Sequence, residues 1–138
     1  MFVVFDTNVL VSYCIGGTHS TVVRILKSSF DVGCVNLFSD QTYLELFQVL
    51  HRQKFDKFIS REIRIKILEE LRLTSLFVEI NETFTICRDE KDNKFLDVAW
   101  NGDAEFIITG DEDLLTLSPF QGIPILNPSQ FYSILPCK

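Results

Sequence analysis

Two aspartates follow short apolar runs of the sequence, and their chemistry is that of cation ligands. Asp6 comes directly after Phe2–Phe5, and Asp111 comes shortly after residues 105–109. Such runs, rich in β-branched and aromatic residues, predict strands that are buried on both faces. The ends of parallel strands meet at one edge of a sheet, so the two carboxylates would be neighbours and would repel each other without a cation. Oxygen ligands with no His or Cys nearby favour Mg²⁺ or Mn²⁺ over zinc.

Helix capping is the alternative explanation for aspartates at such positions. Asp111 is a suitable N-cap, and Glu112 and Asp113 after it would interact favourably with the helix dipole. A cap explains Asp6 less well, because only the apolar residues 9–11 follow before polar residues resume. The pattern therefore leaves Asp111 open between a cap and a cation ligand, and a cap is the weaker explanation for Asp6.

Helical geometry separates three further acids. In a helix that begins at Asp92, the apolar residues 95, 96, 98 and 99 face close to the direction of Asp92, at about 100° per residue. Asp92 would then point inward, where a carboxylate needs a partner or a metal, although a helix cap explains it equally well. Asp97 points roughly 140° away from Asp92 and is predicted to be solvated. Glu45 lies nearly opposite the apolar face of its own helix and is also predicted to be solvated.

The elements that must position these residues alternate between strand and helix, which predicts an α/β fold with a parallel sheet and helices on both faces. Apolar runs predict strands at 2–5, 30–38, 105–109 and 123–126, and shorter extended pieces at 77–80 and 84–87. Helical spacing and capping residues predict helices over 9–15, after Ser20, after Ser39, after Ser60, and from Asp92 to Gly102. We expect residues 1–138 to form a single domain.

The composition fits a folded, cytoplasmic protein. Apolar residues make up 46% of the 138 residues, enough for a core, and no apolar run approaches the roughly 18 residues of a membrane span. A signal peptide would have to cross Asp6 and is not expected. The four cysteines have no zinc-binding spacing and are expected to be reduced and buried: Cys14, Cys34, Cys87 and Cys137.

Basic residues are concentrated in one stretch of an otherwise acidic chain. The formal net charge is −6, which argues against nucleic-acid binding by phosphate neutralisation alone. Yet seven of the 13 basic side chains lie between residues 51 and 72, with only four acids among them. Composition alone favours solvated helix faces there. A basic rim that guides a phosphate backbone towards an acidic pocket is the other explanation.

Four segments, taken in order, resemble a PIN domain, specifically the toxin components of prokaryotic toxin–antitoxin pairs. They are VVFDTNVL at 3–10, LELFQVL at 44–50 with Lys54-Phe55 shortly after, RDEKDNKFL at 88–96, and AEFIITGDEDLL at 104–115. The resemblance extends from Phe2 to about Phe131. Gln53 and the pair Tyr13-Cys14 depart from the family pattern, and all three lie outside the acidic set.

The resemblance implies a three-layer α/β/α sandwich and a metal-dependent ribonuclease that uses one or two Mg²⁺ or Mn²⁺ ions. The carboxylates implied both to bind metal and to act in catalysis are Asp6, Glu45, Asp92 and Asp111, with Asp113 as a fifth metal ligand. For Glu45 this contradicts the spacing argument, and the residue would have to reach the site from the edge of its helix. The residues that would orient the carboxylates by hydrogen bonds are Thr7, Asn8 and Thr109.

The same resemblance implies partners. The substrate would be RNA, and the protein would form a homodimer and bind a cognate antitoxin. On this view the basic stretch becomes a substrate rim, with RNA contacts at Arg52, Lys54, Arg61 and Arg64.

Two other functions remain open. A haloacid-dehalogenase-type phosphohydrolase also has an aspartate after its first strand, but its chemistry needs Asp-x-Asp, and Asn8 occupies the second position. The other is a catalytically silent PIN domain that acts only through an antitoxin or its own dimer. A nuclease assay with Mn²⁺ that compares wild type with Asp6→Asn and Asp92→Asn distinguishes these functions.

Overall fold

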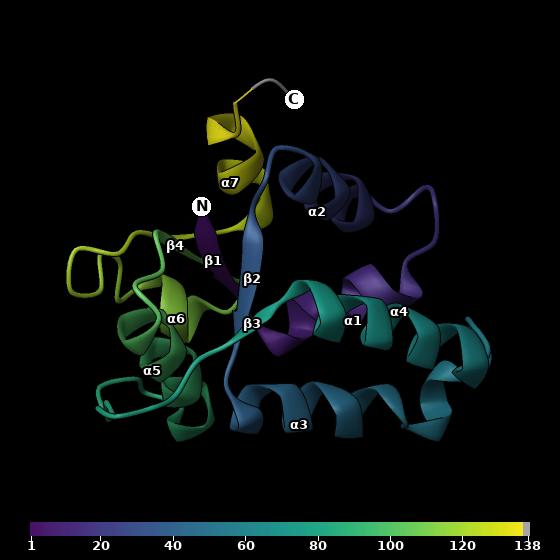
Figure 1. Ribbon diagram of the computed structural model, residues 1–138, viewed down its shortest axis with the longest axis horizontal. Coiled ribbons are helices and arrows are strands. Elements are labelled where there is room, and N and C mark those ends of the chain that lie inside the picture. Colours follow the sequence, from purple (N-terminus) through teal and green to yellow (C-terminus); the bar gives the residue numbers. More distant parts are fainter. Residues whose placement is uncertain (137–138) are drawn as a thin grey trace.

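A parallel sheet forms the centre of the molecule in the computed structural model, which describes residues 1–136 (Figure 1). Its strands are β1 (Phe2–Phe5), β2 (Val35–Phe38), β3 (Leu76–Phe77), β4 (Phe106–Ile108) and β5 (Ile125–Leu126). They lie in the order β3-β2-β1-β4-β5, and each neighbouring pair is parallel. β1 is central, with Val3 opposite Asn36 on one side and Phe106 on the other. The predicted parallel sheet is confirmed.

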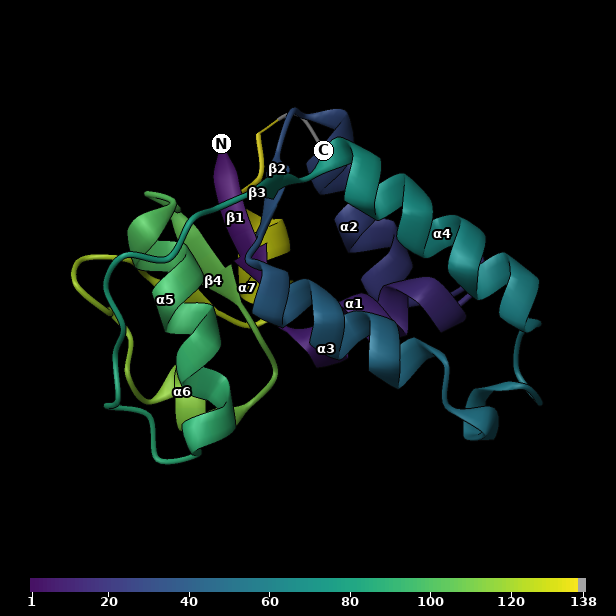
Figure 2. The same cartoon turned by 60° about the horizontal axis from the view of Figure 1, so that its bottom comes forward.

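Helices cover both faces of the sheet, which confirms the α/β/α sandwich (Figures 1 and 2). The helices are α1 (Thr7–Ile15), α2 (Thr21–Asp31), α3 (Asp40–Leu50), α4 (Arg61–Thr74), α5 (Asn93–Asn101), α6 (Glu112–Leu115) and α7 (Pro128–Ile134), with 3₁₀ turns η1 (Gln53–Phe55) and η2 (Glu90–Asp92). Val3 and Phe5 contribute to the core under α1, α2, α4 and α7, whereas Val4 contributes to the core under α5 and α6. Because alternate residues of β1 enter different cores, its sequence is apolar without interruption.

The predicted helix ends are set by local chemistry. The hydroxyls of Ser20, Ser39 and Ser60 each accept a hydrogen bond from a backbone N–H in the first turn of α2, α3 and α4. Gly102 ends α5 as predicted, and a side chain is excluded there because a Cβ would lie 2.6 Å from the Leu37 Cδ1 atom. These ends place the carboxyl ends of β1 and β2 next to the first turns of α1 and α3 (Figure 1).

Two predicted strands differ from the structure. The strand at 30–38 is only β2, because Phe30 belongs to α2, where its ring packs edge-on against the Phe5 ring, 6.0 Å between centroids. Residues 84–87 form no strand and lie in a loop, in which Phe84 packs edge-on against Phe120, 4.8 Å between centroids. At both places the apolar residues pack into the core from a helix or a loop, so an apolar run did not identify a strand.

The predictions about buried cysteines and membrane spans can be checked against the structure of the described residues. Cys14, Cys34 and Cys87 are buried free thiols, and burial raises the pKa of the Cys14 thiol to about 12. Cys137 lies outside the described residues. None of the helices within residues 1–136 combines the length and the apolar character that a membrane crossing requires.

Candidate metal centre

Asp6 lies at the carboxyl end of β1, and both of its carboxylate oxygens accept hydrogen bonds. The Val9 N–H donates to Oδ1 over 2.8 Å, which caps α1, and the Thr109 hydroxyl donates to Oδ2. The backbone N–H of Asp6 itself bonds to the Ile108 carbonyl, 3.0 Å away on β4. Asp6 is only 4% exposed. Capping was the weaker expectation for Asp6, and the structure shows that it does cap a helix.

Asp111 reaches the same edge of the sheet from β4. Its N–H donates to the Thr109 hydroxyl over 2.9 Å, and its Oδ1 accepts from the Asp113 N–H over 2.9 Å, which caps α6. Thr109 is fully buried and therefore connects the Asp6 carboxylate to the Asp111 backbone through one hydroxyl. The expected orienting role of Thr109 requires a hydrogen bond of this kind to the Asp6 carboxylate.

Asp92 differs from the other two because its side chain caps nothing. It lies at the start of α5 without a capping hydrogen bond, and within the described residues its buried Oδ2 has no hydrogen-bond partner. Carboxylate oxygens of Asp89, Asp92 and Asp111 lie within 4.8 Å of one another. We call these three residues the carboxylate cluster. A buried oxygen without a partner beside two further carboxylates is suited to a divalent cation.

Asp89 was missed as a cluster member by the sequence reasoning. It precedes Asp92 by three residues across the 3₁₀ turn η2, and side chains at this spacing in a 3₁₀ helix lie on the same side. Recognising a 3₁₀ turn before α5 would have revealed it. Asp89 also caps η2, because its Oδ1 accepts from the Lys91 N–H over 3.1 Å.

Burial and mutual repulsion shift the acidity of these groups. Burial raises the pKa of Asp92 to about 7, together with a proton shared with Asp111 and the charges of Asp111, Asp89 and Asp6. The pKa of Asp6 is also raised, mainly by burial, and the hydrogen bonds from Thr109 and Val9 oppose this change. A divalent cation among these oxygens would stabilise their ionised forms, so the donor set fits Mg²⁺ or Mn²⁺.

Glu45 belongs to this edge of the sheet, and the spacing argument was wrong about its surroundings. Its side chain is 31% exposed, and it is an ion-pair partner of Lys94 through Oε2 and a hydrogen-bond acceptor from the Thr7 hydroxyl through Oε1. Lys94 lies on α5 and Thr7 on α1, so the spacing of residues within α3 could not reveal these partners. The charge of Glu45 acts on the pKa of Asp6, although Glu45 is not part of the carboxylate cluster.

The remaining acids and Asn8 lie outside the carboxylate cluster. Asp113 is one-third exposed, and its Oδ1 lies 3.9 Å from the Nε of Arg88, a side chain that is 89% exposed. Asn8 is exposed on the first turn of α1, in contrast to the buried Thr7. Asp97 was predicted to be solvated, which is wrong: it is buried and accepts a hydrogen bond from the Phe84 N–H over 2.7 Å. The loop that carries Phe84 covers this side of α5.

Three of the four residues predicted to contact RNA are exposed in the structure, and the fourth is buried. Arg52, Lys54 and Arg61 are exposed, as an RNA contact requires. Arg64 is fully buried, donates to the Arg52 carbonyl over 3.1 Å and forms an ion pair with Asp56. Arg64 therefore fixes the loop that contains η1, and its predicted contact with RNA is corrected.

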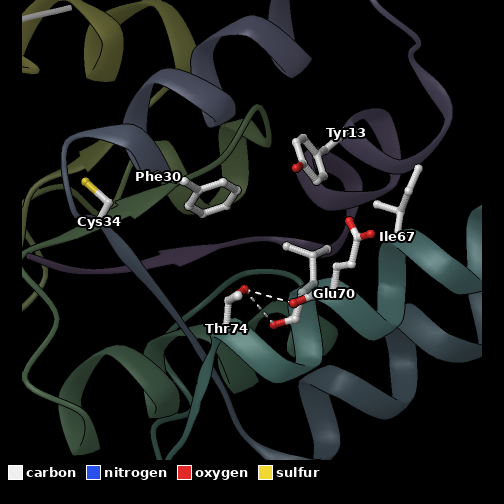
Figure 3. Close-up of a pocket in the computed structure, with 7 residues that line it drawn as sticks. Tyr13, Phe30, Cys34, Ile67, Glu70 and Thr74 are labelled. Atoms are coloured by element: carbon white, nitrogen blue, oxygen red, sulfur yellow. Dashed lines mark hydrogen bonds between the residues drawn. The ribbon is translucent and has the colours of Figure 1, made fainter.

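One hollow in the structure is separate from the carboxylates. It has a volume of about 290 Å³ and lies between α1, α2 and α4, where Tyr13 and Glu70 face each other (Figure 3). The Thr74 hydroxyl already donates to the Glu70 carbonyl over 2.9 Å. A single carboxylate among apolar side chains is a poor cation site, so the carboxylate cluster is the better candidate.

Comparison with known proteins agrees with this geometry. The family model described as the PIN domain matches residues 2–113. The chain is also similar to the uncharacterized protein MJ1680 of Methanocaldococcus jannaschii, with 39% identity over 116 residues, which cover 83% of this chain and 74% of that protein. The matched region contains Asp6, Glu45, Asp92 and Asp111. The chain therefore belongs to the PIN domain family.

Proposed function

We propose that this protein is a metal-dependent endoribonuclease. The observation that carries the proposal is the carboxylate cluster beside Asp6, whose oxygens lie within 4.8 Å of one another. One of its members, Asp92, has a buried oxygen without a hydrogen-bond partner in the described residues. PIN domains are typically nucleases and use divalent metals, which supports the proposal. Membership of the PIN domain family argues against the haloacid-dehalogenase-type phosphohydrolase. That chemistry needs a second aspartate two residues after the first, and this chain has Asn8 at that position.

Each residue of the site has a role in this proposal. When bound, Mg²⁺ or Mn²⁺ supplies a Lewis acid that activates water and offsets charge on the phosphate. Asp6, Asp92 and Asp111 would hold it, together with Asp89, Glu45 and Asp113 around them. Thr109 keeps the Asp6 carboxylate aimed at the site, and Thr7 does the same for Glu45. A carboxylate oxygen of these residues that is not bound to metal would accept the proton of the attacking water.

The proposed substrate is RNA, and the exposed cations Arg52, Lys54 and Arg61 would contact its phosphates. Since these contacts are electrostatic, RNA affinity should fall steadily as salt is raised. A protein of net charge −6 needs such a local basic surface to bring a polyanion to its acidic site.

The proposal is tested by RNA cleavage with Mn²⁺, comparing wild type with Asp6→Asn and Asp92→Asn. Each substitution removes a metal-binding charge at nearly constant volume, so cleavage should fall at least about 100-fold. Asp31→Asn, at the exposed end of α2, is the matched control and should retain wild-type activity. Cleavage that survives both site substitutions, or that wild type never shows, refutes the nuclease.

We further propose that the protein is the toxin of a toxin–antitoxin pair and forms a homodimer. Support comes from large apolar side chains that remain exposed on α3, β3 and α4, as expected of a surface that binds protein: Leu44, Phe47, Leu73, Leu76 and Phe77. Light scattering of the purified protein measures the oligomer. Co-expression with a small gene beside its own tests for an antitoxin, which should form a stable complex and inhibit cleavage. A protein that is active in cleavage and monomeric at all concentrations would contradict the homodimer alone.

A further inference from the structure

A nearly buried lysine pairs with one of the proposed ligands. Lys94 is in the first turn of α5, two residues after Asp92, and its side chain is only 10% exposed. Its ammonium forms an ion pair with Glu45 Oε2, while Glu45 Oε1 accepts from the Thr7 hydroxyl. Both oxygens of Glu45 therefore already have partners on α5 and α1.

The position of Lys94 is unfavourable apart from this ion pair and the Phe95 ring, whose centroid lies 5.6 Å from the Lys94 Nζ. A cation near a helix N-terminus opposes the helix dipole, and burial of an ammonium is costly unless it is paired. The other cation beside these acids, Arg88, is 89% exposed and 3.9 Å from Asp113, so water screens it. Among the residues that the structure describes, Lys94 is therefore the cation that acts at close range on a proposed ligand, Glu45.

Glu45 is held apart from the carboxylates that meet. Oxygens of Asp89, Asp92 and Asp111 come within 4.8 Å of one another, and Glu45 is not in that group. An ammonium and a divalent cation on the same carboxylate repel each other, and this repulsion is strong in a site with little water. The long, flexible lysine stem allows the ammonium to leave without movement of α5.

We propose that Lys94 is a resident counter-ion that occupies Glu45 in the metal-free protein and competes with the divalent ion for this carboxylate. This inference rests on the proposed metal-dependent function and adds regulation of metal affinity at the same site. Lys94 acts on the metal through Glu45 and is a positioning residue. Its charge also keeps the acidic edge of the sheet stable before metal binds.

The test is calorimetric titration of Mn²⁺ into wild type, Lys94→Met and Lys94→Arg at fixed pH and salt. Lys94→Met removes the competitor and should tighten Mn²⁺ binding by about three- to tenfold, the equivalent of one partly buried ion pair. Lys94→Arg keeps the charge and should stay within about twofold of wild type. Lys91→Met is the matched control, since it removes one exposed cation from the turn before α5 and should change affinity little.

A double-mutant cycle with Glu45→Gln shows whether the effect passes through Glu45. In that background Lys94→Met should change Mn²⁺ affinity by about twofold or less, because the pair no longer exists. Mn²⁺ binding that is unchanged or weaker in Lys94→Met, while wild type binds Mn²⁺ and Asp92→Asn does not, overturns the counter-ion and leaves the metal centre standing. Absence of Mn²⁺ binding in every variant overturns both.

Discussion

Asp92→Asn should stabilise the metal-free protein at neutral to alkaline pH while it removes activity. The folded protein holds the Asp92 proton more tightly than the unfolded chain, because the pKa rises from 3.8 to about 7. This contribution to stability is fully present below about pH 4 and is lost as pH rises through about 7. Above that pH, wild type carries an ionised carboxylate next to Asp111 and Asp89, and the amide of asparagine does not.

The size of the effect follows from the same shift. A pKa change from 3.8 to about 7 corresponds to an upper bound of about 4 kcal/mol. Asp92 is partly solvated and shares its proton with Asp111, so water and neighbouring groups absorb much of this energy. We expect a gain of about 1–2 kcal/mol at pH 8, or about 3–8 °C in Tm for a protein of this size.

Thermal unfolding with a chelator at pH 5 and pH 8 measures the prediction. At pH 5 the folded wild type keeps the Asp92 proton while the unfolded chain has mostly released it, so the gain from Asp92→Asn should be less than about half of the gain at pH 8. Asp31→Asn, the exposed control, should show no gain that grows with pH. A gain of equal size at both pH values, or a loss of stability at pH 8, refutes the assignment of the raised pKa to Asp92. Added Mn²⁺ should raise the Tm of wild type and of Asp31→Asn, but not of Asp92→Asn.

Three further predictions concern the support of the site and its rim. Arg64→Met should lower the free energy of unfolding by about 1–3 kcal/mol in urea titrations, because the buried guanidinium no longer binds the Arg52 carbonyl and the half-exposed Asp56, and the RNA affinity of the folded protein should not change. Thr109→Val removes the hydroxyl that holds the Asp6 carboxylate and should weaken Mn²⁺ binding by about 10–100-fold in calorimetry; unchanged affinity would contradict its orienting role. The double substitution Lys54→Gln with Arg61→Gln should reduce the slope of log affinity against log salt for single-stranded RNA by about 0.7 per lost phosphate contact, as measured by filter binding. An unchanged slope would show that neither residue contacts RNA.

The features predictable from sequence were those that depend on residues close together in the chain. Ser20, Ser39 and Ser60 cap their helices through N–H groups only three residues away, so the sequence contains both partners. β1 was equally clear, because a strand buried on both faces is apolar at every position. The order of four family segments then extended these local predictions to the whole fold.

The surroundings of individual side chains could not be predicted, because they depend on distant segments. Helical spacing identifies one apolar face, yet Asp97 and Glu45 on other faces are covered by the loop of Phe84 and by α1 with α5. Arg64 looked like one more cation in a basic stretch until the turn at η1 placed Asp56 beside it. Each case requires contacts between elements, which a single helix does not specify.

Capping and cation binding, which the sequence presents as alternatives, occur together in the structure. Asp6 and Asp111 each use one oxygen to cap the helix that follows, so the fold fixes these carboxylates whether or not a metal is bound. Asp92 makes no capping bond, and its pKa is raised to about 7 by burial first and then by its contact with Asp111 and the nearby carboxylate charges. A substitution at Asp6 therefore changes a helix cap and a ligand at once. Asp92→Asn removes a ligand but no capping bond, so it should lose activity while the fold gains stability, and its loss of activity cannot be attributed to unfolding.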